Sequence, residues 1–149
     1  MPAVTAHVLL VEDNLDEAEL TRLAVQRCSP AITVDHVSNG QEAVDYLLRK
    51  GAHANRTSAQ PALVLLDLKM PLLDGFGVLA QVKKQEHLRD TPIVVLTSSS
   101  EPSDLRRAYA LGTNAYVAKP TDYAEFVAAM KHVCEFWLRI NRAVPGAPH

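Results

Sequence analysis

The sequence predicts a doubly wound α/β domain, in which helices cover both faces of a parallel sheet. Five short, largely apolar runs alternate along the 149 residues with five longer segments of helical periodicity. Four of these runs are continuously apolar, which is typical of strands buried on both faces. The length is that of one domain, and the chain has no internal repeat or low-complexity linker.

The strands are expected at residues 8–11, 32–37, 62–66, 93–96 and 115–118. The helices are expected to run from about residue 15 to 28, 40 to 51, 75 to 85, 102 to 111 and 122 to 141. Residues 53–60 are polar and irregular, which favours a surface loop. Five strand–helix units predict a flavodoxin-like sheet with the strand order 2-1-3-4-5.

Five polar residues stand at or just beyond the ends of these strands, namely Glu12, Asp13, Asp67, Thr97 and Lys119. The carboxyl ends of parallel strands line the crevice in which open α/β sheets bind ligands, so we expect these side chains to meet. Three carboxylates in one place repel one another and favour a hard cation such as Mg²⁺. The added hydroxyl and ammonium groups indicate that the bound species is a phosphoryl group.

Each residue also has an ordinary explanation when it is taken alone. Asp67 could simply end a strand, Lys119 could be a solvated charge, and Thr97 could belong to a polar loop. The constellation, rather than any one motif, carries the prediction.

Composition narrows the possible functions. A net charge of −2 argues against nucleic-acid binding, and we expect neither a signal peptide nor a membrane span, because the sequence shows no signal-peptide pattern and no long apolar run. Cys28 and Cys134 lack CxxC spacing and indicate reduced thiols in a cytoplasmic protein.

The segments VLLVEDN (8–14), LLDLKMPLLDG (65–75), VLTS (95–98) and AKP (118–120) together resemble the receiver domain of two-component response regulators. The resemblance runs from about His7 to Arg139. It implies one receiver domain in residues 1–149, with a core at about 7–141, a flexible tail at 142–149 and no output domain. The 53–60 insertion and the ending at residues 136–138 look most like stand-alone regulators that partner bacterial phytochrome-type kinases.

The resemblance also implies roles for individual residues. Asp67 would accept a phosphoryl group from a sensor histidine kinase. Glu12 and Asp13 would hold Mg²⁺ together with Asp67 and the backbone carbonyl of Lys69. The residues that would contact the phosphoryl group or respond to it are Thr97, Ser98, Lys119 and, at the aromatic switch position, Tyr116.

The leading hypothesis is therefore a phosphorylation-dependent switch, without enzymatic activity beyond phosphoacceptance and autodephosphorylation. The switched surface would comprise the fourth helix, the fifth strand and the fifth helix. A phosphorelay shuttle that passes its phosphoryl group to a histidine phosphotransfer protein is an open alternative. A Mg²⁺-dependent hydrolase with an Asp nucleophile is a remote one, because that family needs a second Asp where Lys69 stands.

The last predicted helix is longer than the sheet is deep. About 12 helical residues would cover a five-residue strand, so the final turns should extend beyond the sheet. These turns carry Phe136, Trp137, Leu138 and Ile140, more apolar surface than one buried stripe requires. They either cover the base of the monomer's own core or form a homodimer interface, and we expect the homodimer.

Overall fold

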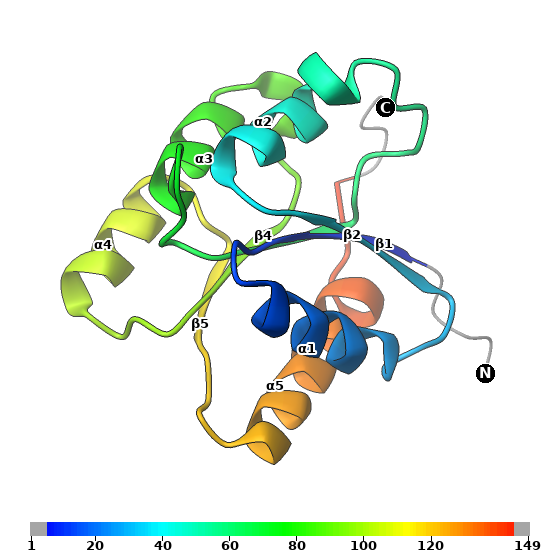
Figure 1. Ribbon diagram of the computed structural model, residues 1–149, viewed down its shortest axis with the longest axis vertical. Coiled ribbons are helices and arrows are strands. Elements are labelled where there is room, and N and C mark those ends of the chain that lie inside the picture. Colours follow the sequence, from blue (N-terminus) through cyan, green and yellow to red (C-terminus); the bar gives the residue numbers. More distant parts are fainter. Residues whose placement is uncertain (1–5, 145–149) are drawn as a thin grey trace.

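A computed structural model describes residues 6–144 of the chain (Figure 1). Five parallel strands form one sheet in the order β2-β1-β3-β4-β5, which confirms the predicted fold. The strands are β1 (Ala6–Val11), β2 (Ile32–Val37), β3 (Leu63–Leu66), β4 (Ile93–Thr97) and β5 (Ala115–Ala118). Residues 145–149 of the predicted tail lie outside the described part of the chain.

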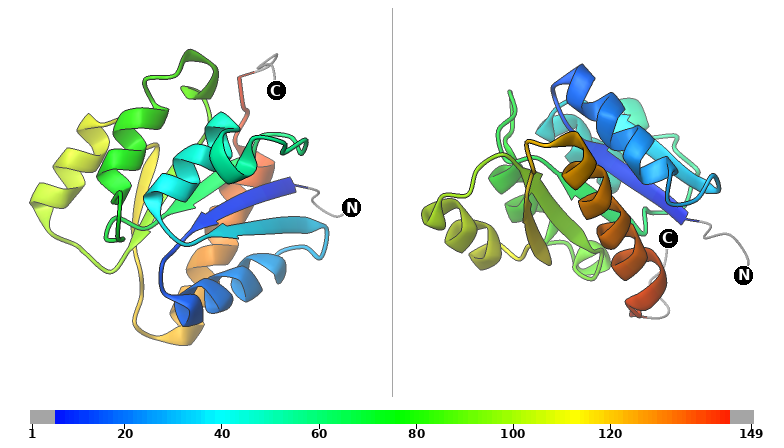
Figure 2. Two further views of the ribbon diagram at one scale, coloured as in Figure 1. Left: turned by 45° about the horizontal axis from the view of Figure 1, so that its top comes forward. Right: turned by 90° about the horizontal axis from the view of Figure 1, so that it is seen from below.

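The helices are α1 (Leu15–Gln26), α2 (Gly40–Leu48), α3 (Gly75–Val82), α4 (Pro102–Ala110) and α5 (Tyr123–Glu135). Helices α1 and α5 cover one face of the sheet, and α2, α3 and α4 cover the other (Figures 1 and 2). Alternate residues of β1 enter opposite cores, with Val8 and Leu10 on the α1–α5 side and Leu9 and Val11 on the other. The three central strands are almost fully buried, as their continuous apolar runs predict.

Side-chain caps fix where several helices begin. Asn14, Asn39, Asp74 and Asp122 each accept a hydrogen bond from a backbone amide in the first turn of their helix. Since α1, α3 and α5 start directly after the site-bearing strand ends and loops, these caps also hold the site loops in place.

The first three helices end slightly earlier than predicted, whereas the last reaches about its predicted end with a changed backbone form. α2 ends at Leu48, where Arg49 adopts a left-handed conformation with φ 54°. α3 ends at Val82, and a 3₁₀ turn, η2 (Glu86–Leu88), then places Leu88 in the core. The last helix continues as a π-helical segment, η3 (Phe136–Ile140).

The segment at residues 53–60 is more ordered than its composition suggests. It follows a 3₁₀ turn, η1 (Gly51–His53), and is organised by Arg56. The Arg56 guanidinium donates to the carbonyl of Tyr46 from two nitrogens, at 3.1 and 2.8 Å, and lies 3.9 Å from the centre of the Tyr46 ring. Within residues 6–144, no helix has both the length and the apolar character needed to cross a membrane.

Candidate functional site

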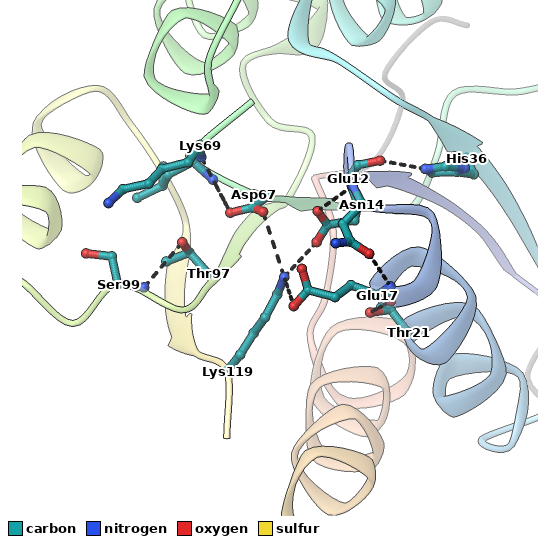
Figure 3. A network of polar contacts seen from close by, with 11 residues as sticks. Glu12, Asn14, Glu17, Thr21, His36, Asp67, Lys69, Thr97, Ser99 and Lys119 are labelled. Atoms are coloured by element: carbon teal, nitrogen blue, oxygen red, sulfur yellow. Dashed lines mark hydrogen bonds and ion pairs between the residues drawn. The ribbon is translucent and has the colours of Figure 1, made fainter. Parts of the chain in front are cut away.

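The structure brings the five strand-end residues together at the carboxyl edge of the sheet, and Figure 3 labels Glu12, Asp67, Thr97 and Lys119 among them. Glu12 and Asp13 follow β1, Asp67 follows β3, Thr97 ends β4 and Lys119 follows β5. Because β1, β3, β4 and β5 are neighbours in the sheet, their ends converge although they are far apart in the sequence.

Lys119 links the acidic groups. Its Nζ atom lies 2.6 Å from Glu12 Oε1 and 3.8 Å from Asp67 Oδ2, and its side chain is only 10% exposed. Oε1 of Glu17, on the first turn of α1, lies 3.6 Å from the same Lys119 Nζ atom, and the Glu17 side chain is about half exposed to solvent. A single buried ammonium therefore serves several carboxylates and leaves the cluster with excess negative charge.

Glu12 shows the electrostatic consequence of this arrangement. Burial raises the pKa of Glu12 to about 7, the hydrogen bond from Lys119 partly offsets that rise, and the charge of Asp67 adds to it. Burial by itself lowers the pKa of Lys119, but the hydrogen bond to Glu12 and the charge of Asp67 outweigh it and raise that pKa overall. The carboxylates are thus stabilised incompletely by the chain alone.

Glu12, Asp13 and Asp67 can each offer one carboxylate oxygen to a shared cation, with these oxygens within 4.8 Å of one another. Oxygen donors at this spacing, near an open crevice, fit a hard divalent cation. The excess negative charge of the cluster fits such an ion too, since the cation would supply the charge that Lys119 lacks.

The main chain fixes the orientation of Asp67. Its Oδ1 accepts a hydrogen bond of 2.7 Å from the amide of Leu68 and a longer one of 3.5 Å from the amide of Lys69. Gly75 lies against this turn, since a Cβ atom there would sit 2.4 Å from the carbonyl oxygen of Asp67. The glycine is therefore required by close backbone approach beneath the carboxylate.

Thr97 and Tyr116 join the site to the neighbouring loop. The hydroxyl of Thr97, which is buried, lies 3.4 Å from the amide of Ser99, and Ser98 between them is exposed. The hydroxyl of Tyr116 donates a hydrogen bond of 2.9 Å to the carbonyl of Ser99. Movement of this loop would therefore change the environment of both side chains.

Residues 8–131 match the family described as the response regulator receiver domain. The chain belongs to this family. The receiver domain is 40% identical over 139 residues to the probable methanogenesis regulatory protein FilR2 of Methanothrix harundinacea, with 93% of this chain and 87% of FilR2 covered.

Solved structures of phytochrome-associated regulators are also similar to this receiver domain. The phosphorylated cyanobacterial phytochrome response regulator RcpA has a TM-score of 0.88 and 34% identity, with 95% of this chain and 99% of RcpA covered. The bacteriophytochrome response regulator AtBRR has a TM-score of 0.73 and 46% identity, with 93% and 99% covered. The receiver domain is thus related to phytochrome response regulators.

A bound divalent cation has been observed in one of these relatives. The Mn²⁺-bound form of response regulator Rcp1 has a TM-score of 0.84 and 31% identity, with 93% of this chain and 99% of Rcp1 covered. The three carboxylates of the present chain match the donor set that such an ion prefers.

Sequence reasoning missed one residue next to the site. His36, at the end of β2, has its Nε2 atom 2.7 Å from the backbone carbonyl of Glu12 (Figure 3). This contact and the backbone hydrogen bond from the Glu12 amide to Val37 tie the acidic loop to the edge strand. Nothing in the sequence around His36 signals the contact, because it depends on the pairing of β1 with β2.

The four apolar residues of η3 divide into two pairs. Trp137 and Leu138 pack against the core on the α1–α5 side of the sheet. Phe136 and Ile140 remain 45% and 59% exposed. The segment therefore covers part of the monomer's own core and also presents apolar surface.

Proposed function

We propose that this receiver domain is a phosphorylation-dependent signalling switch, in which Asp67 accepts a phosphoryl group from the phosphohistidine of a sensor histidine kinase. The observation that carries this proposal is the position of Asp67 Oδ2, which faces the Lys119 ammonium. The three carboxylates around it carry more negative charge than this one ammonium can balance. The hydrogen bonds to Oδ1 leave Oδ2 as the attacking oxygen.

The transfer exchanges one bond to phosphorus for another. The phosphorus–nitrogen bond of the phosphohistidine breaks as a phosphorus–oxygen bond to Asp67 forms, and the imidazole takes up a proton from solvent as it leaves. Lys119 stabilises negative charge on the transferring oxygens. Glu12, Asp13, Asp67 and the backbone carbonyl of Lys69 would hold Mg²⁺, which supplies further positive charge there.

The acyl phosphate then acts on the loop after β4. The hydroxyl of Thr97 and the amide of Ser98 turn toward the added phosphoryl oxygens, because these are strong hydrogen-bond acceptors. The hydrogen bond between Tyr116 and the Ser99 carbonyl links this movement to β5. The surface formed by α4, β5 and α5 is the two-state element that the movement biases.

The kinase would approach from the side of α1 and the start of α5. A cavity of about 310 Å³ lies beside Lys119 and is lined by residues that include Leu20, Ser98, Pro120 and Phe126. Leu20 is an exposed apolar side chain on this lining, and α1 also exposes Leu15 and Leu23. The similarity to phytochrome response regulators supports a bacteriophytochrome kinase as the partner.

Phosphoryl transfer from candidate kinases with labelled phosphate tests this proposal. Asp67→Asn should lose labelling while it keeps the wild-type fold, and Asp35→Asn, a carboxylate outside the site, is the matched control and should be labelled. Full labelling of Asp67→Asn under native conditions would overturn the assignment. Rapid transfer onward to a histidine phosphotransfer protein would favour the phosphorelay shuttle over a terminal switch.

We also propose that the exposed half of η3 contributes to a homodimer. Phe136 and Ile140 present apolar side chains, with Phe136 packed edge-on against the Trp137 ring at 5.0 Å between centroids. Isologous pairing would remove both side chains from water. The surface is continuous with α5 and thus with the proposed switch.

Sedimentation at micromolar concentration tests the dimer. Phe136→Ala/Ile140→Ala should sediment as a folded monomer, whereas the wild type should associate. Leu138→Ala is the control, because Leu138 packs on the monomer's own core and its loss should lower stability. A wild type that stays monomeric both with and without phosphorylation contradicts the proposal.

A further inference from the structure

Cys28 and Cys134 are 106 positions apart in the sequence, yet the fold brings them together. Cys28 lies just beyond α1 and Cys134 near the end of α5, and these two helices lie side by side on one face of the sheet (Figures 1 and 2). The Cys28 thiol lies between the two helices, with Sγ 3.7 Å from the carbonyl oxygen of Ala24 in α1 and 3.9 Å from that of Met130 in α5. Both cysteines line one small cavity of about 30 Å³.

The two thiols differ in accessibility. Cys134 is only 2% exposed, and its thiol is within hydrogen-bonding reach of Cys28. Burial, followed by the neighbouring Cys28, raises the pKa of the Cys134 thiol well above its ordinary value. Cys28 is half-buried and also lines a second, larger cavity. A dissolved reagent can therefore reach Cys28 first.

The larger cavity, of about 350 Å³, has two cationic side chains on its lining, Arg27 and Lys131, and one anionic side chain, Glu135. Its apolar lining comes from Ala24 and Val127. The net positive charge beside the accessible sulfur favours an anionic reagent, since charges of opposite sign raise its local concentration.

We propose that Cys28 and Cys134 form a dithiol site that reacts with an anionic low-molecular-weight disulfide of the glutathione type and closes to an intramolecular disulfide between α1 and α5. This modification site lies toward the C-terminal ends of α1 and α5, away from the cavity beside Lys119, and is independent of phosphoryl transfer. It uses neither Asp67 nor its ligands.

The reaction proceeds in two exchange steps. The Cys28 sulfur attacks one sulfur of the reagent, which breaks the reagent's sulfur–sulfur bond and releases one glutathione that takes up the Cys28 proton. The Cys134 sulfur then attacks Cys28 in the mixed disulfide, and the second glutathione leaves with the Cys134 proton. The two cysteines are oxidised by two electrons, and one glutathione disulfide is reduced to two thiols.

Incubation of the native, reduced protein with glutathione disulfide tests the pairing. The chain has only two cysteines, so no other thiol contributes to the signal. Intact mass should fall by two hydrogens with no glutathione retained, the midpoint of thermal unfolding should rise by several degrees, and dithiothreitol should reverse both changes. A native protein whose thiols stay free while the urea-unfolded chain reacts, or one that keeps stable glutathione, overturns the proposal.

Single variants test the order of attack. Cys134→Ala should retain one glutathione on Cys28, because no second thiol can displace it. Cys28→Ala should stay unmodified while folded, because Cys134 is buried. The reverse pattern contradicts Cys28 as the entry thiol. The wild-type measurement does not depend on how well either variant folds.

A charge reversal tests the recognition of an anion. Lys131→Glu should slow the reaction with glutathione disulfide by about threefold to tenfold at low salt and leave the rate with the neutral bis(2-hydroxyethyl) disulfide unchanged. Equal slowing with both reagents would show that the cavity's charge plays no part. Lys131 is exposed and lies outside the phosphoacceptor cluster, so it serves as a clean probe.

Discussion

Two polar networks involve strand β1, and they differ in how completely their charges are matched. Beyond the end of β1, Glu12 and Asp67 share the ammonium of Lys119, and Asp13 adds a third carboxylate to the cluster. Near its beginning, Asp35 accepts hydrogen bonds from Tyr46 at 2.6 Å and from His7 at 3.1 Å. Arg56 covers the Tyr46 ring and donates to the Tyr46 carbonyl, so its positive charge stands near the single carboxylate of this second network.

The difference separates a structural network from a functional one. Burial, followed by the bond to Asp35, raises the pKa of Tyr46 to about 12, so its hydroxyl remains a donor at every physiological pH. The Asp35 carboxylate, the Tyr46 hydroxyl and the Arg56 guanidinium each have a hydrogen-bond partner within the chain. These bonds hold α2 and the 53–60 segment on the sheet. The Asp67 cluster has a single ammonium for three carboxylates, so a bound cation would complete its charge balance.

Removal of the metal should produce the largest effect, because the unmatched cluster depends on it. Excess chelator should lower the rate of phosphorylation by acetyl phosphate at least about 100-fold. Glu12→Gln/Asp13→Asn should do the same in the presence of Mg²⁺. Labelling that proceeds unchanged in chelator would show that the carboxylates need no cation.

The matched network should respond in the opposite way. Arg56→Ala removes hydrogen bonds to the Tyr46 carbonyl and to Gln60, so the free energy of unfolding should fall by about 1–3 kcal/mol. The rate of phosphorylation should stay at the wild-type value. Urea denaturation and acetyl phosphate labelling of one preparation measure both quantities, and a parallel loss of labelling would erase the contrast between the networks.

A smaller effect is expected where the edge strand supports the acidic loop. His36→Ala frees the Glu12 carbonyl, so the dissociation constant for Mg²⁺ should rise about tenfold without loss of the fold. His36→Gln restores a donor at a similar reach and should recover part of the affinity. Titration calorimetry measures both variants. An unchanged constant in His36→Ala would mean that the loop is held without this contact.

The smallest effect concerns pH in the absence of metal. The pKa of Glu12 is raised from 4.5 to about 7 in the folded state, so the folded state binds this proton more tightly than the unfolded chain does. The free energy of unfolding should therefore fall as pH rises through that window, with a slope below about 1.4 kcal/mol per pH unit. Glu12→Gln should lack this component. Identical pH slopes in the two proteins would refute the raised pKa.

The sequence was sufficient for most of the fold and for the convergence of the polar residues at the strand ends. Continuous apolar runs located the central strands, and the polar residues at their ends had to converge once the sheet was parallel. It was insufficient for contacts that depend on side-chain packing between distant segments. The His36–Glu12 contact, the Arg56–Tyr46 stack and the Cys28–Cys134 pair each join residues whose neighbours in the chain give no signal of the partner.

The division of η3 illustrates the same limit. Helical periodicity predicted an apolar surplus near the end of the chain, but a π-helical turn changes which side chains face the core. Trp137 and Leu138 consequently cover the monomer, and Phe136 and Ile140 do not. The sequence pattern predicted how much apolar surface the segment carries. Only the backbone geometry shows which of these side chains face the core and which face solvent.

The chemical identity of the phosphorylated residue tests the central claim most directly. The protein is phosphorylated with acetyl phosphate and Mg²⁺, the acyl phosphate is reduced with borohydride, and the modified residue is located by peptide mass spectrometry. The account predicts a single homoserine at position 67, and its loss in Asp67→Asn. Modification at Asp13, or a phosphate that resists borohydride because it sits on a hydroxyl, would contradict it.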